Sequence, residues 1–221
     1  MLVTDEQIVK KRRSKGERTK HLILESAIAV LAAQGIKGAT HRAIASHANI
    51  QLSLTTYYFK DIQELVRQAF ELNAANIIHN IAEQWQPIID LVDGLSKADL
   101  RRVSVRVELR EKLTPLISNM ITANISNNPQ QLIVEKQLFS EMHVTPELVF
   151  ISQQLQLAQL QPCLQLCQYF AQDDIEINAE ILLSQIQNTG YRQLQVTTPI
   201  NDNDILKTIH QILAIIIRIK P

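Results

Sequence analysis

The sequence predicts an all-α protein with a small N-terminal three-helix domain and a larger helical C-terminal domain. Only five glycines and seven prolines occur in 221 residues, which disfavours a turn-rich sheet protein. Apolar residues recur at helical spacing, and strong helix formers such as Leu, Ala, Gln and Glu fill the positions between them. Hydrophobic residues make up 46% of the chain, enough for a sizeable core.

Three helices and the start of a fourth, longer one are expected near the N-terminus. Ser14 and Glu17 fit a capping box before a helix over 16–34, which Gly35 ends and in which Ile23 recurs at core spacing. Two short helices are predicted over 41–48, capped by Thr40 with Ile44 inward, and over 51–58, because Asn49 tolerates the left-handed backbone of a tight turn between them. Asp61 and Glu64 fit another capping pattern, which opens the longer helix that should end near Trp85, before Pro87.

The remainder of the chain reads as further helices with almost no strand signal. They are predicted over 88–94, 97–126 with a kink at Pro115, 130–142, 146–171, 177–195 and 202–219. The last is rich in isoleucine, but it is too short and too often interrupted by polar residues to span a bilayer. No membrane contact is therefore expected.

Charge is divided unequally along a chain whose net charge is zero. Residues 1–69 carry eleven Lys or Arg against six Asp or Glu, whereas residues 70–221 carry eleven against sixteen. A phosphate backbone would attract the first part and repel the second. Residues 1–15 form a flexible basic arm in this interpretation, either a solvated tail or a segment that reaches into a DNA groove.

No export signal is recognised, so the cytoplasm is the expected location.

The most specific pattern is the run from Thr40 to Phe59, in which two short helices share one turn. Together with the first helix it resembles the DNA-binding domain of the TetR/AcrR family of regulators over about residues 16–76. The resemblance rests on Ile23-Leu24, Ser26-Ala27, Val30-Leu31, Gly35, Ile44-Ala45, Ala48 and the aromatic close Tyr57-Tyr58-Phe59. Asn49 stands where the family has a turn glycine. Ile62 stands where the family commonly has a lysine that contacts a DNA phosphate, and Lys60, two residues earlier, could make that phosphate contact instead.

The third helix is the expected DNA-reading element, because the major groove admits one helix. Its polar residues and the helix ends divide into two groups. Base edges or thymine methyls are assigned to Gln51, Leu52, Ser53, Thr55 and Thr56, and phosphates to Thr40, Arg42, Tyr57, Tyr58 and Lys60. Leu54 and Phe59 are expected in the core.

The resemblance implies that residues 77–221 bind a small-molecule effector and pair two subunits. Large apolar residues are the candidates for an effector pocket: Trp85, Met120, Phe139, Met142, Phe150 and Tyr169. The helix over 146–171 is apolar on two sides, so its second stripe is assigned to a dimer interface: Leu157, Leu160, Leu164 and Cys167. Burial of that stripe inside one subunit is the alternative. Cys163 and Cys167 are interpreted as buried, inert thiols.

The function predicted is a DNA-binding transcriptional regulator, a ligand-responsive repressor that binds a palindromic operator as a homodimer. No cofactor, metal site or catalytic triad is expected, because the histidines lack ligand spacing and no nucleophile and base can be paired. Two alternatives stay open. One is a helical small-molecule-binding protein or enzyme with a vestigial helix-turn-helix, and the other is an architectural protein that binds DNA without effector control.

Overall fold

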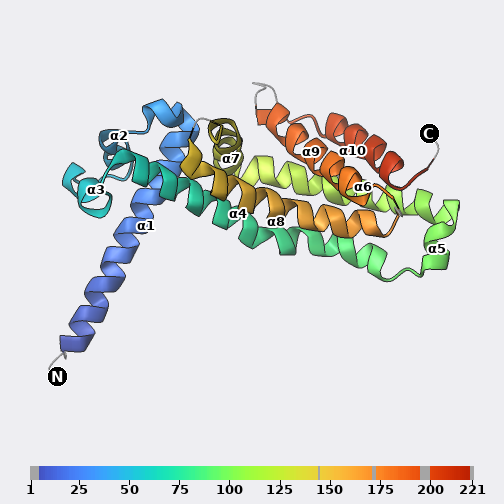
Figure 1. The fold of residues 1–221 in the computed structure, drawn as a ribbon, viewed down its shortest axis with the longest axis horizontal. Coiled ribbons are helices and arrows are strands. Elements are labelled where there is room, and N and C mark those ends of the chain that lie inside the picture. Colours follow the sequence, from blue (N-terminus) through green and yellow to red (C-terminus); the bar gives the residue numbers. More distant parts are fainter. Residues whose placement is uncertain (1–4, 144, 171–172, 195–199, 220–221) are drawn as a thin grey trace.

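The computed structural model describes residues 5–143, 145–170, 173–194 and 200–219, with side chains from residue 15 onward, and these ranges contain no strand. The all-α prediction is confirmed. None of the helices in these ranges is long and apolar enough to cross a membrane. In chain order (Figure 1) the elements are α1 (Asp5–Gly38), α2 (His41–His47), α3 (Leu52–Tyr58), α4 (Ile62–Asp93), α5 (Lys97–Arg101), α6 (Val103–Asn127), α7 (Pro129–Glu141), η1 (Pro146–Leu148), α8 (Val149–Gln168), α9 (Ile175–Leu194) and α10 (Asp202–Ile216).

The turn between α2 and α3 has the backbone that the sequence predicts. Thr40 caps α2 by accepting a hydrogen bond from the Ala43 N–H at 3.1 Å. Asn49 has φ 52°, in the left-handed region. The Ile50 N–H donates to the Ala45 carbonyl and closes the turn at 3.0 Å. The short helices are therefore held at a fixed angle by local hydrogen bonds.

We expect substitutions at Asn49 to separate backbone strain from side-chain contacts, because this side chain is exposed. Asn49→Gly should leave the free energy of unfolding within about 0.5 kcal/mol of the wild type, whereas Asn49→Val should lower it by about 1–2 kcal/mol. Urea unfolding followed by circular dichroism measures both. Equal stability of the two variants would show that the turn does not require a left-handed residue.

The first helix is longer than the sequence indicates. It begins at Asp5 rather than at residue 16, so residues 5–15 continue a helix instead of forming the flexible arm that was expected. Figure 1 shows this part of α1 projecting beyond α2 and α3. Gly35 has φ 69°, and the helix is broken there before it continues to Gly38, which agrees with the predicted interruption.

The prediction that Pro87 ends the fourth helix is wrong. Helix α4 continues through Pro87 to Asp93 and absorbs the separate helix expected over 88–94. Pro87 lies on the exposed side, where water can satisfy the carbonyl that loses its N–H partner. Trp85, Ile88 and Ile89 are buried on the other side. Because buried residues both precede and follow Pro87 in the sequence, their packing keeps the helix continuous through the proline.

The single helix predicted over 97–126 is two helices. Arg102 has an extended backbone, with ψ 124°, between α5 and α6. Ser96 and Asp99 form a reciprocal capping box that defines α5 as a short separate helix. Pro115 lies inside α6.

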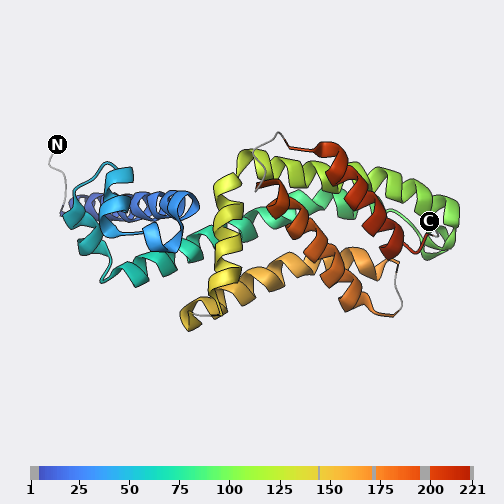
Figure 2. The ribbon, with the colours of Figure 1, turned by 90° about the horizontal axis from the view of Figure 1, so that it is seen from above.

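Two hydrophobic cores meet at α7. The N-terminal core contains Ile23, Phe59 and Phe70, and it extends to Val134 and Leu138 of α7. The other core joins α4, α6, α8, α9 and α10. Figure 2 shows α7, in yellow, crossing α4 between the N-terminal elements and the rest of the chain. Helix α7 therefore contacts both parts of the molecule.

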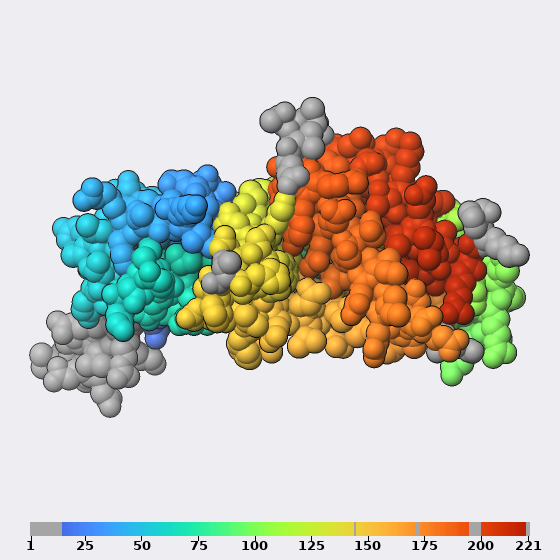
Figure 3. Space-filling model, turned by 45° about the horizontal axis from the view of Figure 1, so that its top comes forward, coloured from blue at the N-terminus to red at the C-terminus, as the bar shows by residue number. Residues whose placement is uncertain are grey.

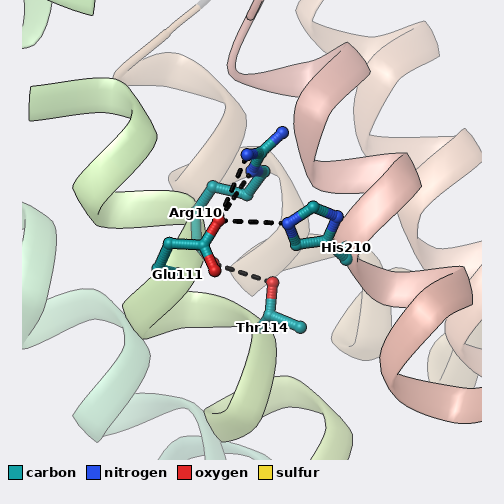
Figure 4. A network of polar contacts seen from close by, with 4 residues as sticks. All are labelled: Arg110, Glu111, Thr114 and His210. Atoms are coloured by element: carbon teal, nitrogen blue, oxygen red, sulfur yellow. Dashed lines mark hydrogen bonds and ion pairs between the residues drawn. The ribbon is translucent and has the colours of Figure 1, made fainter. Parts of the chain in front are cut away.

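A polar network ties α10 to α6 at the surface (Figure 4). The Glu111 carboxylate accepts hydrogen bonds from Arg110 at 3.1 Å and contacts His210 Nε2 at 3.1 Å. Thr114 donates to the Arg110 carbonyl at 2.7 Å. The hydrogen bond from His210 is the main cause that lowers the pKa of Glu111. Because that pKa is lowered in the fold, this contact stabilises the protein above the ordinary carboxyl pKa and is lost as the pH falls through the lowered value.

Candidate nucleic-acid interface

Most of the polar residues predicted to read bases lie on one exposed face of α3. Gln51, Leu52, Ser53 and Thr56 are exposed. Gln51 has an extended backbone at the start of the helix, and its side chain makes no capping hydrogen bond. The N-terminal elements, blue to teal in Figure 3, form one end of the molecule. This face is available for hydrogen bonds and methyl contacts in a major groove.

Thr55 does not belong to this face, which corrects the sequence-based assignment. Its exposed fraction is 0%, and its hydroxyl donates to the Leu52 carbonyl at 2.8 Å. Satisfying the hydroxyl within the helix allows a threonine to be buried at low cost. Leu54, which was expected in the core, is only half-buried. The inward face of α3 is therefore centred on Thr55.

The side chains predicted to hold phosphates surround α3. Thr40, Arg42 and Lys60 are exposed. Neither Arg42 nor Lys60 forms an ion pair with a described side chain. Cations without acidic partners are available to a phosphate backbone, and they add a salt-dependent term to binding. The Lys60 side chain projects while its backbone N–H donates to Glu64 Oε2 at 2.8 Å, which fixes the chain before α4.

Two adjacent tyrosines close α3 in different environments. Tyr57 is 78% exposed, whereas Tyr58 is half-buried, and their rings meet edge to face at 5.0 Å. A Cβ at Gly16 would lie 3.5 Å from the Tyr58 hydroxyl, so this tyrosine reaches α1. Phe59 is buried, as predicted, with Lys20 Nζ 5.5 Å from its ring centre. Tyr57 is the tyrosine that is free to meet DNA.

Ile62 packs against the N-terminal core, so it serves the fold rather than the interface. Asp61 caps α4 by accepting the Glu64 N–H at 2.8 Å, as its sequence pattern predicts. The N-terminal end of α4 is therefore anchored by an apolar contact and a cap. Lys60 is the cation beside this helix end.

A comparison with protein-family models identifies this region. The model described as "Bacterial regulatory proteins, tetR family" matches residues 23–69, which contain α2, α3 and the ends of α1 and α4 that pack on them. The N-terminal domain belongs to the tetR family. Because that family consists of bacterial regulators, the chain is a DNA-binding transcriptional regulator, as the sequence resemblance implies. No curated protein matches the chain.

Solved structures share the fold of this protein over nearly its whole length. A transcriptional regulator from Rhodococcus sp. is 11% identical, with a TM-score of 0.69, over 91% of this chain and 99% of that one. A protein from Mesorhizobium loti described as a TetR-family regulator is 12% identical, with a TM-score of 0.67, over 92% and 97%. A structure of the multidrug binding protein EbrR with imidazole is 16% identical, with a TM-score of 0.51, over 88% and 89%. These structures share the fold, and the first two are described as regulators rather than enzymes.

The C-terminal part of the chain contains a cavity of about 90 Å³ between α4, α6, α7, α8 and α9. Its apolar wall includes Trp85, Met120 and Leu183. Much of the rest is amide, and these side chains are Asn80, Gln84, Asn124, Asn128, Gln131, Gln159 and Gln187. Glu135 of α7 is the acidic residue in the lining. The cavity combines aromatic and apolar surface with many hydrogen-bonding groups.

The structure brings two of the six predicted pocket residues to this cavity. They are Trp85 and Met120. Phe139 and Met142 pack against the N-terminal core instead, Phe150 is exposed, and Tyr169 packs against the C-terminal core from the end of α8. Sequence reasoning sought large apolar residues and missed the amides and Glu135. In the sequence Glu135 is followed by Lys136 and Gln137, so it reads as part of a polar helix surface and no local signal marks it as a pocket residue.

The stripe of α8 assigned to a dimer interface is divided in the structure. Leu157 is 53% exposed, Leu160 and Leu164 are half-buried against the C-terminal core, and Cys167 is fully buried. Because Cys167 faces the core of its own subunit, it cannot contact a partner subunit. Burial raises the pKa of the Cys167 thiol to about 11, so it stays protonated. Among the described residues, no group of three or more His, Cys, Asp or Glu could hold a metal ion.

Proposed function

We propose that this tetR-family regulator is a ligand-responsive repressor that binds a palindromic operator as a homodimer. The observation that carries the proposal is the exposed polar face of α3, bordered by cations without acidic partners, in a domain of known regulatory family. A repressor that occupies its operator needs no catalytic group, so we propose no enzymatic activity. We also propose a cytoplasmic location, because a regulator of this kind needs access to the chromosome.

The exposed apolar residues of α8 and α9 support the homodimer. Phe150 and Leu157 on α8 and Ile177 and Ile181 on α9 are exposed, and the two helices pack together. Exposed apolar side chains on adjacent helices are costly in water and typical of subunit interfaces. A two-fold pair would present two α3 helices to half-sites about one helical turn, roughly 34 Å, apart. The operator would then share the two-fold symmetry.

Helix α7 supplies a route from the cavity to the DNA-binding domain. Glu135 and Gln131 line the cavity, while Gln137 donates to the Leu31 carbonyl of α1 at 2.9 Å. Asn73 of α4 donates to the Gln131 carbonyl at 3.1 Å. A ligand that moves α7 would also move α1 and α4, and a small change in half-site spacing opposes simultaneous binding of both half-sites. The imidazole complex of EbrR supports the proposal that this fold takes up small molecules.

The test is binding of the purified protein to DNA from upstream of its own gene, compared with scrambled DNA, over a salt series. We expect selective binding with two protomers per site, weakened at least tenfold between about 50 and about 200 mM salt. Tyr57→Ala should weaken it by roughly tenfold through loss of a phosphate contact. The fold should survive, because the Tyr57 side chain is 78% exposed.

Tyr57→Phe is the matched variant, because it keeps the ring and removes only the hydroxyl. Equal binding to both DNAs would contradict operator recognition and favour an architectural DNA-binding role. No binding to any DNA would favour the other alternative, a ligand-binding protein with a vestigial helix-turn-helix. Release of the operator by extracted small molecules would separate the ligand-responsive regulator from the architectural protein.

A further inference from the structure

Glu135 is a buried acid in the wall of the cavity. Its exposed fraction is 2%, and its Oε1 accepts a hydrogen bond from Gln159 Nε2 at 2.7 Å. Gln187 Nε2 in turn donates to Gln159 Oε1 at 2.9 Å. The carboxyl is therefore held in place by amides from α8 and α9. If Glu135 served only to hold these helices together, this hydrogen-bond network would be sufficient.

No cationic side chain of the described residues pairs with Glu135. No described Lys, Arg or His nitrogen lies within 4.0 Å of this carboxyl, and the cavity lining includes none of these residues. The neighbouring Lys136 lies over the Tyr191 ring, 5.9 Å from its centre, outside the lining. From α9, Tyr191 is the titratable group beside Glu135, and from α4, α6 and α8 the lining polar groups are neutral amides. The cavity thus holds one acid and no base.

Burial decides the charge state of this acid when the cavity holds no cation. Desolvation raises the pKa of Glu135, and hydrogen bonding to Gln159, Tyr191 and Gln187 offsets it only in part. Burial, the nearby Glu135 carboxyl and hydrogen bonding to it raise the pKa of Tyr191. The Tyr191 hydroxyl is thus close to Glu135, but it is buried with no described partner within the 3.5 Å of a well-formed hydrogen bond. The Tyr191 hydroxyl and the Glu135 carboxyl, which has no cationic partner, therefore indicate a binding position for a polar group of a ligand.

We propose that the effector of this cavity is a small organic cation, a protonated amine, amidine or guanidine, whose N–H groups bond to Glu135. This rests on the proposed function of a ligand-responsive regulator. The cation restores the ionised carboxylate, so binding releases the Glu135 proton to solvent. Cavity amides accept its other N–H groups, and Trp85 offers an aromatic face to the charge. The volume of about 90 Å³, below the few hundred typical of drug-sized sites, limits it to about one ring or a short chain.

Anionic ligands are disfavoured by the same arrangement. A carboxylate or phosphate would lie beside a buried acid with no lysine, arginine or histidine in the wall to pair with it. A neutral ligand could use the amides, but it would not favour ionisation of Glu135. The two classes therefore differ in how binding depends on pH.

The experiment is calorimetric titration of the full chain with benzamidine and n-butylamine, each beside neutral and anionic compounds of similar shape: benzamide, n-butanol, benzoate and butyrate. Between about pH 5 and about pH 8 both benzamidine and n-butylamine stay protonated and charged. We expect at least one cation to bind more tightly than its neutral counterpart. Its affinity should rise about tenfold per pH unit while free Glu135 is protonated, with release of about one proton. Buffers of different ionisation enthalpy measure that proton.

Glu135→Gln keeps the shape and an acceptor for Gln159 but removes the charge. It should weaken the cation at least tenfold, by about 1.4 kcal/mol or more, and abolish the pH dependence. Glu141→Gln makes the same change on the same helix, outside the lining, and should bind as the wild type does. Circular dichroism checks that both variants are folded. Preference for neutral or anionic compounds, a flat or reversed pH slope, unchanged affinity in Glu135→Gln, or no cation binding would each overturn the proposal.

The operator assay, run in parallel, separates this inference from the proposed function. Cation binding that depends on Glu135 without an effect on DNA would uphold the ligand class and contradict the ligand-responsive repressor. Specific operator binding without any Glu135-dependent cation binding would overturn the ligand class alone.

Discussion

Phe59→Ala should lower the free energy of unfolding by about 3–5 kcal/mol and abolish operator binding, although Phe59 is not expected to touch DNA. The ring is 1% exposed and follows α3 directly, in the core shared with Ile23 of α1 and Leu65 of α4. Its backbone N–H still donates to the Thr55 carbonyl at 3.1 Å, but its own backbone is extended, with φ −133° and ψ 128°, and this ends α3. Removing the ring leaves a cavity where three helices meet, in a protein whose total stability is typically only 5–15 kcal/mol.

Urea unfolding measures the loss of stability, and amide hydrogen exchange of α2 and α3 tests where it is felt. Phe59→Leu should cost clearly less, because it retains much of the apolar volume. Leu52→Ala is the matched control on the same helix: its side chain is 43% exposed, so stability should change by about 0.5 kcal/mol or less. A Phe59→Ala protein that unfolds like the wild type would show that this ring does not join α3 to α4.

The N-terminal elements were predictable because their signals are local. The Thr40 cap, the left-handed Asn49 and the Asp61 cap each follow from one side chain and its immediate backbone. Helix spacing predicted the buried Ile23 and Ile44 in the same way. Such features depend little on distant parts of the chain, so a sequence pattern is sufficient to find them.

The errors arise where packing overrides local preference. Proline disfavours a helix interior, yet Pro87 is tolerated because its neighbours Trp85 and Ile88 are buried along α4. Thr55 is polar, yet it is buried because its hydroxyl is satisfied inside its own helix. For Pro87 the deciding factor is the packing of its neighbours, and for Thr55 it is the direction in which a short helix faces the core. The pattern of residue types reveals neither.

The cavity was less predictable, because its lining comes from five helices far apart in sequence. Residues such as Gln84, Gln159 and Gln187 read individually as surface amides, and only the fold brings them together. Apolar size, the criterion applied to the sequence, selects core residues as readily as pocket residues. Glu135 is followed by Lys136 and Gln137 in the sequence, so only its burial in the fold, with an exposed fraction of 2%, marks it as unusual, because burial of a carboxyl is costly.

Substitutions on either side of α3 should separate sequence reading from phosphate binding. Gln51 is exposed at the start of α3, and its amide makes no capping bond, so it is free to bond to a base edge. Gln51→Ala should cost about 1–3 kcal/mol on the preferred operator, with little change on scrambled DNA and an unchanged salt slope. Gln86→Ala, at an exposed glutamine of α4 beyond the DNA-binding domain, should change neither.

Lys60→Ala should produce the opposite pattern. Its side chain is exposed and has no ion pair with a described residue, so its expected contribution is a phosphate contact without sequence information. Binding to operator and scrambled DNA should weaken by the same factor, and the slope of log affinity against log salt should decrease by about 0.9. Fluorescence anisotropy over a salt series with both DNAs measures each quantity. If Gln51→Ala changed the salt slope, or Lys60→Ala changed the preference between the DNAs, the orientation assigned to α3 in the groove would be wrong, since the base-facing and phosphate-facing sides would have been exchanged.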